Sequence, residues 1–103
     1  MPKFIYSFDG GRMPESKEEG EKVMKAWTDW MGSIGDAIVD GGGPAGKSKT
    51  VTKSGVSDGG GDNPLMGYTI VTAATIDGAI SLLKGCPHFD ADGTVEVAEI
   101  IEM

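Results

Sequence analysis

Cysteine, histidine and long apolar runs are scarce in this sequence. It has one cysteine and one histidine, and its apolar runs reach only about five residues, far short of the roughly 20 that cross a bilayer. A single cysteine excludes an intrachain disulfide and fits a reducing cytoplasm. The start of the chain, MPKFIYSFDGG, lacks the apolar core of a signal peptide. We therefore expect a cytoplasmic protein that does not enter a membrane.

Basic residues are also few. Nine Lys and Arg stand against 16 Asp and Glu, which gives a formal net charge of −7. Binding to nucleic acid needs a basic stripe that faces the phosphates, and no such stripe is visible. Binding to a membrane surface fails for a similar reason. The 103 residues are enough for a single domain, residues 1–103, with a modest core.

Periodicity and turn signals divide the chain into six expected elements. A capping box at Ser16 begins the first helix and Thr75 caps the second, while alternating β-prone residues indicate the strands. The expected elements are a strand over Lys3–Phe8, a helix after Ser16 whose apolar stripe runs to Ile38, strands over Lys47–Val56 and Met66–Ala74, a helix from Thr75 to about Lys84, and a strand over Thr94–Met103. This βαββαβ order predicts a ferredoxin-like α+β fold, with one antiparallel sheet and both helices on one face.

The stretch GGGPAGKS, Gly41–Ser48, matches the phosphate-loop pattern G-x-x-x-x-G-K-[ST]. A phosphate loop leaves a strand and enters a helix, so that the helix N-terminus faces the phosphate. Here the expected order is reversed, from helix to strand. We interpret Gly41–Gly46 as a connection between a helix and a strand, and not as a nucleotide site.

A second stretch, His88–Glu99, imitates a calcium loop. His88 stands where the first aspartate belongs, and the chain ends four residues after Glu99, so an acidic turn into the last strand explains the same letters. Cys86, His88 and Asp90 lack a fourth zinc ligand. Cys86 and His88 are also a conceivable nucleophilic pair, although a loop cysteine beside a surface histidine is the default interpretation. We expect no metal and no cofactor.

Both faces of the expected sheet carry apolar side chains. Tyr68 and Ile70 oppose Val71 and Ala73 across one strand. A monomer would expose a sizeable apolar face to water, and a second copy packed sheet against sheet, as a symmetric homodimer, would cover it. Such a dimer encloses a cleft in which a glutamate of the last strand, Glu96 or Glu99, could act as an acid or base. The alternative is that this glutamate lies solvated at the rim.

Several short motifs resemble the YCII-related proteins, small bacterial proteins of the dimeric α/β-barrel class. The motifs are WTDWM at 27–31, GGP at 42–44, GYTIV at 67–71, GCP at 85–87 and GTVEV at 93–97. The resemblance covers nearly the whole chain except about residues 45–63 and implies one domain of this kind. The activity proposed for that family depends on a His in the first helix and an Asp before a proline, and a few relatives are linked to breakdown of chlorinated aromatic compounds. Trp27 and Cys86 stand at those two positions, so the resemblance implies that this pair is absent here.

Two hypotheses for function follow. The first is a protein that binds a small organic molecule, or performs weak acid–base chemistry on it, in the cleft of a dimeric α/β barrel. The second is a non-catalytic dimeric interaction or regulatory module. For the first, the candidates are Trp27, Trp30 and Tyr68 as apolar walls, with Glu96, Cys86 or His88 as polar groups. For the two tryptophans, packing in the core is the alternative.

Overall fold

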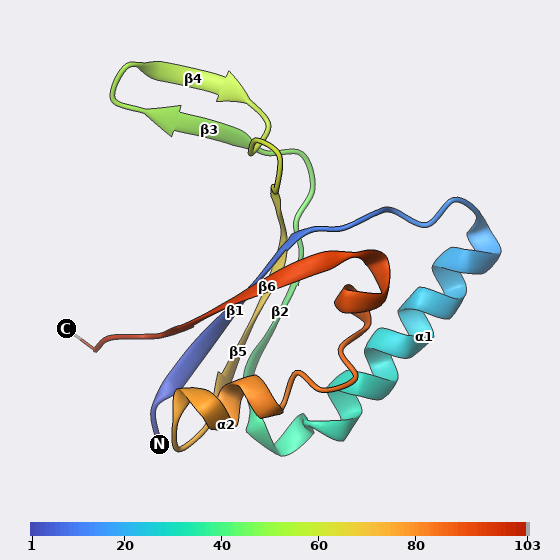
Figure 1. Ribbon diagram of the computed structural model, residues 1–103, viewed down its shortest axis with the longest axis vertical. Coiled ribbons are helices and arrows are strands. Elements are labelled where there is room, and N and C mark those ends of the chain that lie inside the picture. The colour runs from blue at the N-terminus through green and yellow to red at the C-terminus, as the bar shows by residue number, and fades with distance from the viewer. Residues whose placement is uncertain (103) are drawn as a thin grey trace.

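A four-stranded antiparallel sheet with two helices packed on one face forms the body of the protein (Figure 1). The computed structural model describes residues 1–102. The strand order is β2-β5-β1-β6, which confirms the predicted ferredoxin-like α+β fold. The elements are β1 (Lys3–Gly10), α1 (Lys17–Ser33), the 3-10 helix η1 (Gly35–Ala37), β2 (Ile38–Pro44), β3 (Lys49–Thr52), β4 (Gly55–Asp58), β5 (Leu65–Thr72), α2 (Ile76–Ser81), the 3-10 helix η2 (Pro87–Ala91) and β6 (Gly93–Glu99).

Both helices begin where their capping residues predict. The Ser16 hydroxyl accepts from the backbone N–H of Glu19 at 3.0 Å, and the Thr75 hydroxyl accepts from Gly78 at 3.0 Å. The first helix ends at Ser33, however, and does not run to Ile38. Gly32 and Gly35 weaken the helix at this end. Ile38 instead pairs with Val71 in the sheet. The prediction of its C-terminal end was wrong.

The second strand of the sheet also differs from the prediction. Gly41–Pro44 belongs to β2 and is not a connection. Gly42 sits at φ +64°, and a Cβ there would lie 1.8 Å from the Tyr68 carbonyl oxygen, so only glycine fits. Repeated glycines have low strand propensity, which is why this strand escaped detection. No helix follows GGGPAGKS, since the next element is β3.

The polar stretch predicted as an edge strand, Lys47–Val56, does not join the main sheet. It folds back on itself as the β3–β4 hairpin, with pairs from Lys49↔Asp58 to Thr52↔Gly55. In Figure 1 this ribbon stands clear of the body, above the upper ends of β2 and β5. The prediction recognised strand-forming residues here, but it was wrong in expecting one edge strand of the main sheet, since the segment forms two short strands of a separate sheet.

The core lies between the sheet and the helices. Alternate residues of β1 (Phe4, Tyr6 and Phe8) are buried and face Trp30 and Ile34 of the α1 segment. Two buried polar groups fasten α2 to the other elements. The Tyr6 hydroxyl donates to the carbonyl of Ala79, and the Trp30 indole N–H donates to the carbonyl of Leu82 at 3.1 Å. The remaining buried apolar members are Val71, Ala73, Ala79, Leu83 and Cys86.

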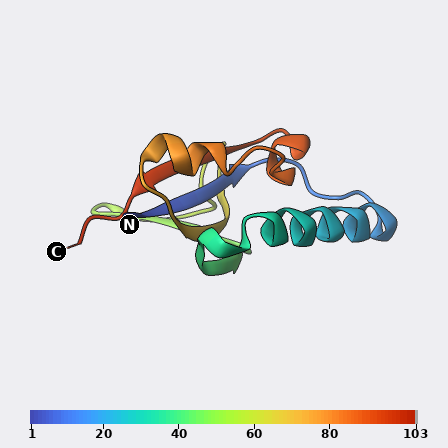
Figure 2. The same cartoon turned by 90° about the horizontal axis from the view of Figure 1, so that it is seen from below.

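The opposite face of the sheet carries no helix. Figure 1 shows the sheet nearly edge-on with α1 on its right, and Figure 2 keeps α1 on the right after the turn. Residues of β1 that alternate with the core positions, such as Ile5 and Ser7, point to this side and are half-buried. We call this surface the open face; within residues 1–102 no other element covers it.

Candidate functional site

The predicted site residues separate onto the two faces of the sheet. Trp27, Trp30, Cys86 and His88 lie on the helix side, where they pack against or within the core. Tyr68 and Glu96 lie on the open face, because both pair with Ser7 of β1, which alternates with the buried Tyr6 and Phe8. The fold therefore assembles two groups and not one.

His88 is buried, so the expectation of a surface histidine was wrong. Only 7% of the residue is exposed. Its Nε2 lies 2.9 Å from the Asp9 carbonyl oxygen, and its ring stands edge-on to Phe8 with centroids 5.7 Å apart. Pro87 opens η2 and turns the chain inward, and Gly93 leaves room for the ring. Spacing in the sequence did not predict this burial, because it depends on a contact with Asp9, 79 residues away in the chain.

Cys86 lies beside His88 in sequence and is 2% exposed. Burial raises the pKa of its thiol, and nearby Asp90 adds to this, while the backbone N–H of His88 acts in the opposite direction and lowers it. The net shift keeps the thiol protonated at neutral pH, whereas a nucleophilic cysteine needs its thiolate. The Cys86–His88 pair therefore lacks the activated sulfur that nucleophilic catalysis requires.

The two tryptophans pack with Phe8 and do not line a cavity. Trp30 is buried, and Trp27 is half-buried with its ring edge-on to Phe8 at 5.1 Å and to Trp30 at 5.7 Å. Trp27 and Cys86 are both packing side chains, so acid–base chemistry has no group at either position.

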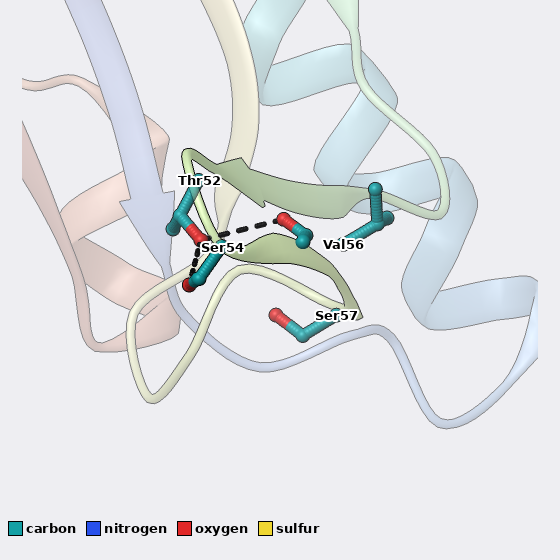
Figure 3. Close-up of a pocket in the computed structure, with 5 residues that line it drawn as sticks. Thr52, Ser54, Val56 and Ser57 are labelled. Atoms are coloured by element: carbon teal, nitrogen blue, oxygen red, sulfur yellow. Dashed lines mark hydrogen bonds between the residues drawn. The ribbon is translucent and has the colours of Figure 1, made fainter.

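The two best-defined hollows on the surface of residues 1–102 are open, and none of the predicted site residues lines either one. The larger, about 340 Å³, lies on the β3–β4 hairpin (Figure 3). Its lining contains hydroxyls but no charged group, and the Thr52 hydroxyl is within 3.0 Å of that of Ser54. The smaller, about 240 Å³, lies at the C-terminal end of α1 beside Leu82. The larger hollow is lined by no ionisable side chain, and the smaller is lined by one, the carboxylate of Asp36, which is not among the predicted site residues.

The open face carries an ordered row of polar side chains. Tyr68, Ser7 and Glu96 stand on adjacent strands in register, a spacing of about 5 Å between neighbouring Cβ atoms. The Ser7 hydroxyl donates to Asp9 Oδ1 at 2.8 Å, and the Tyr68 hydroxyl donates to Asp40 Oδ2 at 3.4 Å. We call these five residues the polar row.

An apolar row lies directly beside the polar row. Ile5 pairs with Ile70 on one side and with Ala98 on the other. Within residues 1–102 the carboxylates of the polar row form no ion pair with a basic side chain; the ion pairs found lie elsewhere. The surface thus combines hydrogen-bond acceptors of negative charge with a neighbouring apolar strip.

Sequence reasoning identified Tyr68 and Glu96 but missed Ser7, Asp9 and Asp40. Alternation along β1 carried the signal for Ser7, since it places that residue on the same face as Ile5. Asp40 was hidden because its strand was not recognised. Glu99 pairs with Phe4 and lies in the register of the helix face, at the exposed end of β6. Of the two candidate glutamates, Glu96 is the one on the open face.

Neither metal ligands nor membrane spans are found in the part of the chain that the structure describes. No group of three or more His, Cys, Asp and Glu side chains is arranged to hold a metal ion. Within the stretch that imitates a calcium loop, Asp92 follows η2 in a left-handed conformation and Glu99 lies in β6. None of the described helices is long and apolar enough to cross a membrane.

Comparison with known proteins identifies the fold. No protein-family model matches the chain, and no curated protein matches its sequence. Among solved structures, the chain is similar to 5-chloro-2-hydroxyhydroquinone dehydrochlorinase from Burkholderia phenoliruptrix AC1100, in its complex with 2,5-dihydroxybenzoquinone. The TM-score is 0.58 at 17% identity, over 100% of this chain and 96% of the other. Likeness at this identity shows the shared fold alone.

Proposed function

We propose that two copies of the chain pair through their open faces and bind a small hydroxylated organic molecule between them. The observation that carries this proposal is the polar row of Tyr68, Ser7, Glu96, Asp9 and Asp40, which lies beside the apolar row of Ile5, Ile70 and Ala98. A ligand site needs a few polar groups to orient the molecule and an apolar wall to desolvate it. Pairing would supply the enclosure that a single open sheet lacks.

The charge of the polar row selects the chemistry of the ligand. Its three carboxylates have no basic partner within residues 1–102, so an anion such as a phosphate or carboxylate would be repelled. A neutral phenol or alcohol would instead donate its hydroxyls to these oxygens, and its ring or carbon chain would pack on the apolar row. Glu96 is the candidate acid–base group, and Tyr68 would position the ligand.

The structural neighbour supports a cyclic ligand that carries oxygen substituents. That dehydrochlorinase has the same fold and was solved with a dihydroxybenzoquinone, a ring that carries oxygen substituents. The lone cysteine and the resemblance to YCII-related proteins support a bacterial cytoplasm as the setting. The proposed chemistry is proton transfer or binding, and it calls for no metal or cofactor.

A specific observation favours the second candidate, a non-catalytic dimeric interaction module. The helix-side candidates are packed in the core, and neither hollow of the single chain contains a predicted site residue. If the two open faces fill each other completely, no space for a ligand remains. Ligand titration separates the two candidates.

The experiment titrates hydroquinone and catechol into the protein and follows binding by saturation-transfer NMR and calorimetry, with benzoate as the anionic comparison. We expect the neutral phenols to bind and benzoate not to. Removing the charge with Glu96→Gln should weaken phenol binding roughly tenfold, as expected for a hydrogen bond to a charged group. Glu99→Gln, in the register of the other face, is the matched control and should change nothing. Absence of phenol binding at millimolar concentration would contradict the ligand proposal and favour the interaction module.

A further inference from the structure

The β3–β4 hairpin is an arm that the single chain leaves uncovered. We define the arm as residues 47–59. Every residue of β3 and β4 is exposed, and the extensive contacts of the arm are between its own two strands. Figure 1 shows it projecting beyond the sheet, and in Figures 1 and 2 it lies on the side of the molecule away from α1. It therefore extends on the side of the open face.

The arm has one face that calls for a partner. Val51 and Val56 stand directly opposite each other and are 73% and 63% exposed. The Lys49–Asp58 ion pair, at 2.8 Å, flanks them on one side. Lys53 lies in the turn between β3 and β4, at the end of the hairpin opposite to that ion pair. A two-stranded ribbon on its own is marginally stable in water, so an ordered arm with an uncovered valine pair indicates a surface that packs on another molecule.

The charge of the arm indicates that its partner is a second copy of the chain. Residues 47–59 contain three of the nine basic residues of the chain and only one of its sixteen acidic residues. The rest of the chain is strongly acidic, and the polar row of the open face contributes Asp9, Asp40 and Glu96. A basic arm beside an acidic face within one sequence is complementary between two copies of that sequence.

The area of the open face also indicates that the arm takes part in the pairing. Four strands of seven or eight residues present a face of roughly 25 by 19 Å, or about 500 Å². A stable protein interface buries about 800 Å² on each partner. The open face alone therefore falls short, and the arm is the exposed apolar element placed to supply part of the remainder.

We propose that the arm of each copy crosses onto the second copy, so that Val51 and Val56 pack at the edge of its open face, beside the paired apolar rows, and Lys53 lies beside the carboxylates at the rim of its polar row. This inference rests on the proposed pairing of open faces. Each ligand site is then formed by two chains: one provides the polar row, and the arm of the other closes the site. Ligand affinity should therefore depend on the arm, although the arm does not contribute to the site of its own chain.

The first test measures the dimer dissociation constant by sedimentation equilibrium. The double variant Val51→Ser/Val56→Ser should weaken the dimer at least tenfold, and Lys53→Glu should weaken it by a similar factor. The matched controls are Ile76→Ser, an exposed apolar residue on α2, and Lys84→Glu, an exposed lysine after α2; both should leave the constant unchanged. Far-UV circular dichroism checks that each variant is folded.

A charge exchange tests the contact itself. Adding Glu96→Lys to Lys53→Glu should recover most of the lost affinity, because the reversed charges meet across the two copies. A Ser54→Cys tip labelled with benzophenone should give cross-links between chains on illumination, and the buried Cys86 stays unlabelled. A parent dimer that ignores every arm variant, or cross-links found only within one chain, would overturn the arm while leaving the pairing intact. A parent that is monomeric would overturn both.

Discussion

The Nε2 atom of His88 lies 2.9 Å from the main-chain oxygen of Asp9, and this contact joins η2 to the end of β1. The ring reaches that position because residue 93 is glycine: a Cβ there would lie 2.1 Å from Nε2. The one histidine of the chain therefore serves the packing of the fold. Its place in a short motif with Cys86 suggested chemistry, but its neighbours are an aromatic ring and a backbone carbonyl.

Gly93→Ala tests that packing. The new methyl group would collide with the His88 ring, and overpacking of this kind costs about 1–3 kcal/mol of unfolding free energy. In a His88→Ala background the collision partner is gone, so the same substitution should cost much less. Urea denaturation of the four proteins in this double-mutant cycle measures the coupling. Gly32→Ala, where nothing lies within 4 Å of the new Cβ, is the control and should be neutral or stabilise α1 by up to about 1 kcal/mol. Fully additive costs would contradict the contact.

Because the Tyr6 hydroxyl is buried, we expect the free energy of unfolding to fall at alkaline pH. Burial raises the pKa of its hydroxyl from 10.0 to about 12, with a smaller contribution from Cys86. Since the folded state holds this proton more tightly than the unfolded chain, its contribution is complete below about pH 10 and is lost as pH rises to about 12. A pKa raised from 10.0 to about 12 corresponds to roughly 2–3 kcal/mol of unfolding free energy. Chemical denaturation at pH 8 to 12 measures this slope.

Tyr6→Phe is the matched variant for the alkaline transition. It should cost about 1 kcal/mol at neutral pH, because the hydrogen bond to the Ala79 carbonyl is lost. Its stability should then fall less between pH 10 and 12 than that of the parent. The part that remains belongs to Cys86, whose thiol pKa is raised in the same direction. Equal alkaline slopes in parent and variant would show that Tyr6 does not cause the loss.

Cys86 should react slowly with thiol reagents in the native protein. The side chain is buried and its thiol stays protonated at neutral pH, so reaction with Ellman's reagent requires opening of the structure. The rate should rise by orders of magnitude in denaturing urea. The exposed thiol of the Ser54→Cys variant should react at once under native conditions. Immediate reaction of the parent would contradict the burial of Cys86.

Local patterns predicted the elements whose signals are local. The alternation of Phe4, Tyr6 and Phe8 identified β1, and Ser16 and Thr75 identified the beginnings of both helices. β2 was missed because three of its seven residues are glycines, and glycine has neither strand propensity nor a side chain that shows a face. It is a strand because it pairs with β5, and that pairing depends on the tertiary structure.

The candidate site could also be predicted only in part, because some of its features depend on contacts between segments that are far apart in the sequence. Tyr68 and Glu96 belong to strands that the sequence predicted, so their shared face follows once the strands are paired. The burial of His88 depends on the space left by Gly93 and on a carbonyl 79 residues away in the chain. Short-range spacing does not contain that information. The polar row likewise depends on the pairing of four strands.

The pairing of open faces is the central claim, and sedimentation equilibrium of the parent protein at micromolar concentration tests it most directly. The apolar row of Ile5, Ile70 and Ala98 should be buried between two copies, so the measured mass should be twice the 10.7 kDa of one chain. The mass should return to that of one chain when Ile70→Glu places a charge in this row. A parent that sediments as a single 10.7 kDa species at these concentrations would contradict the account.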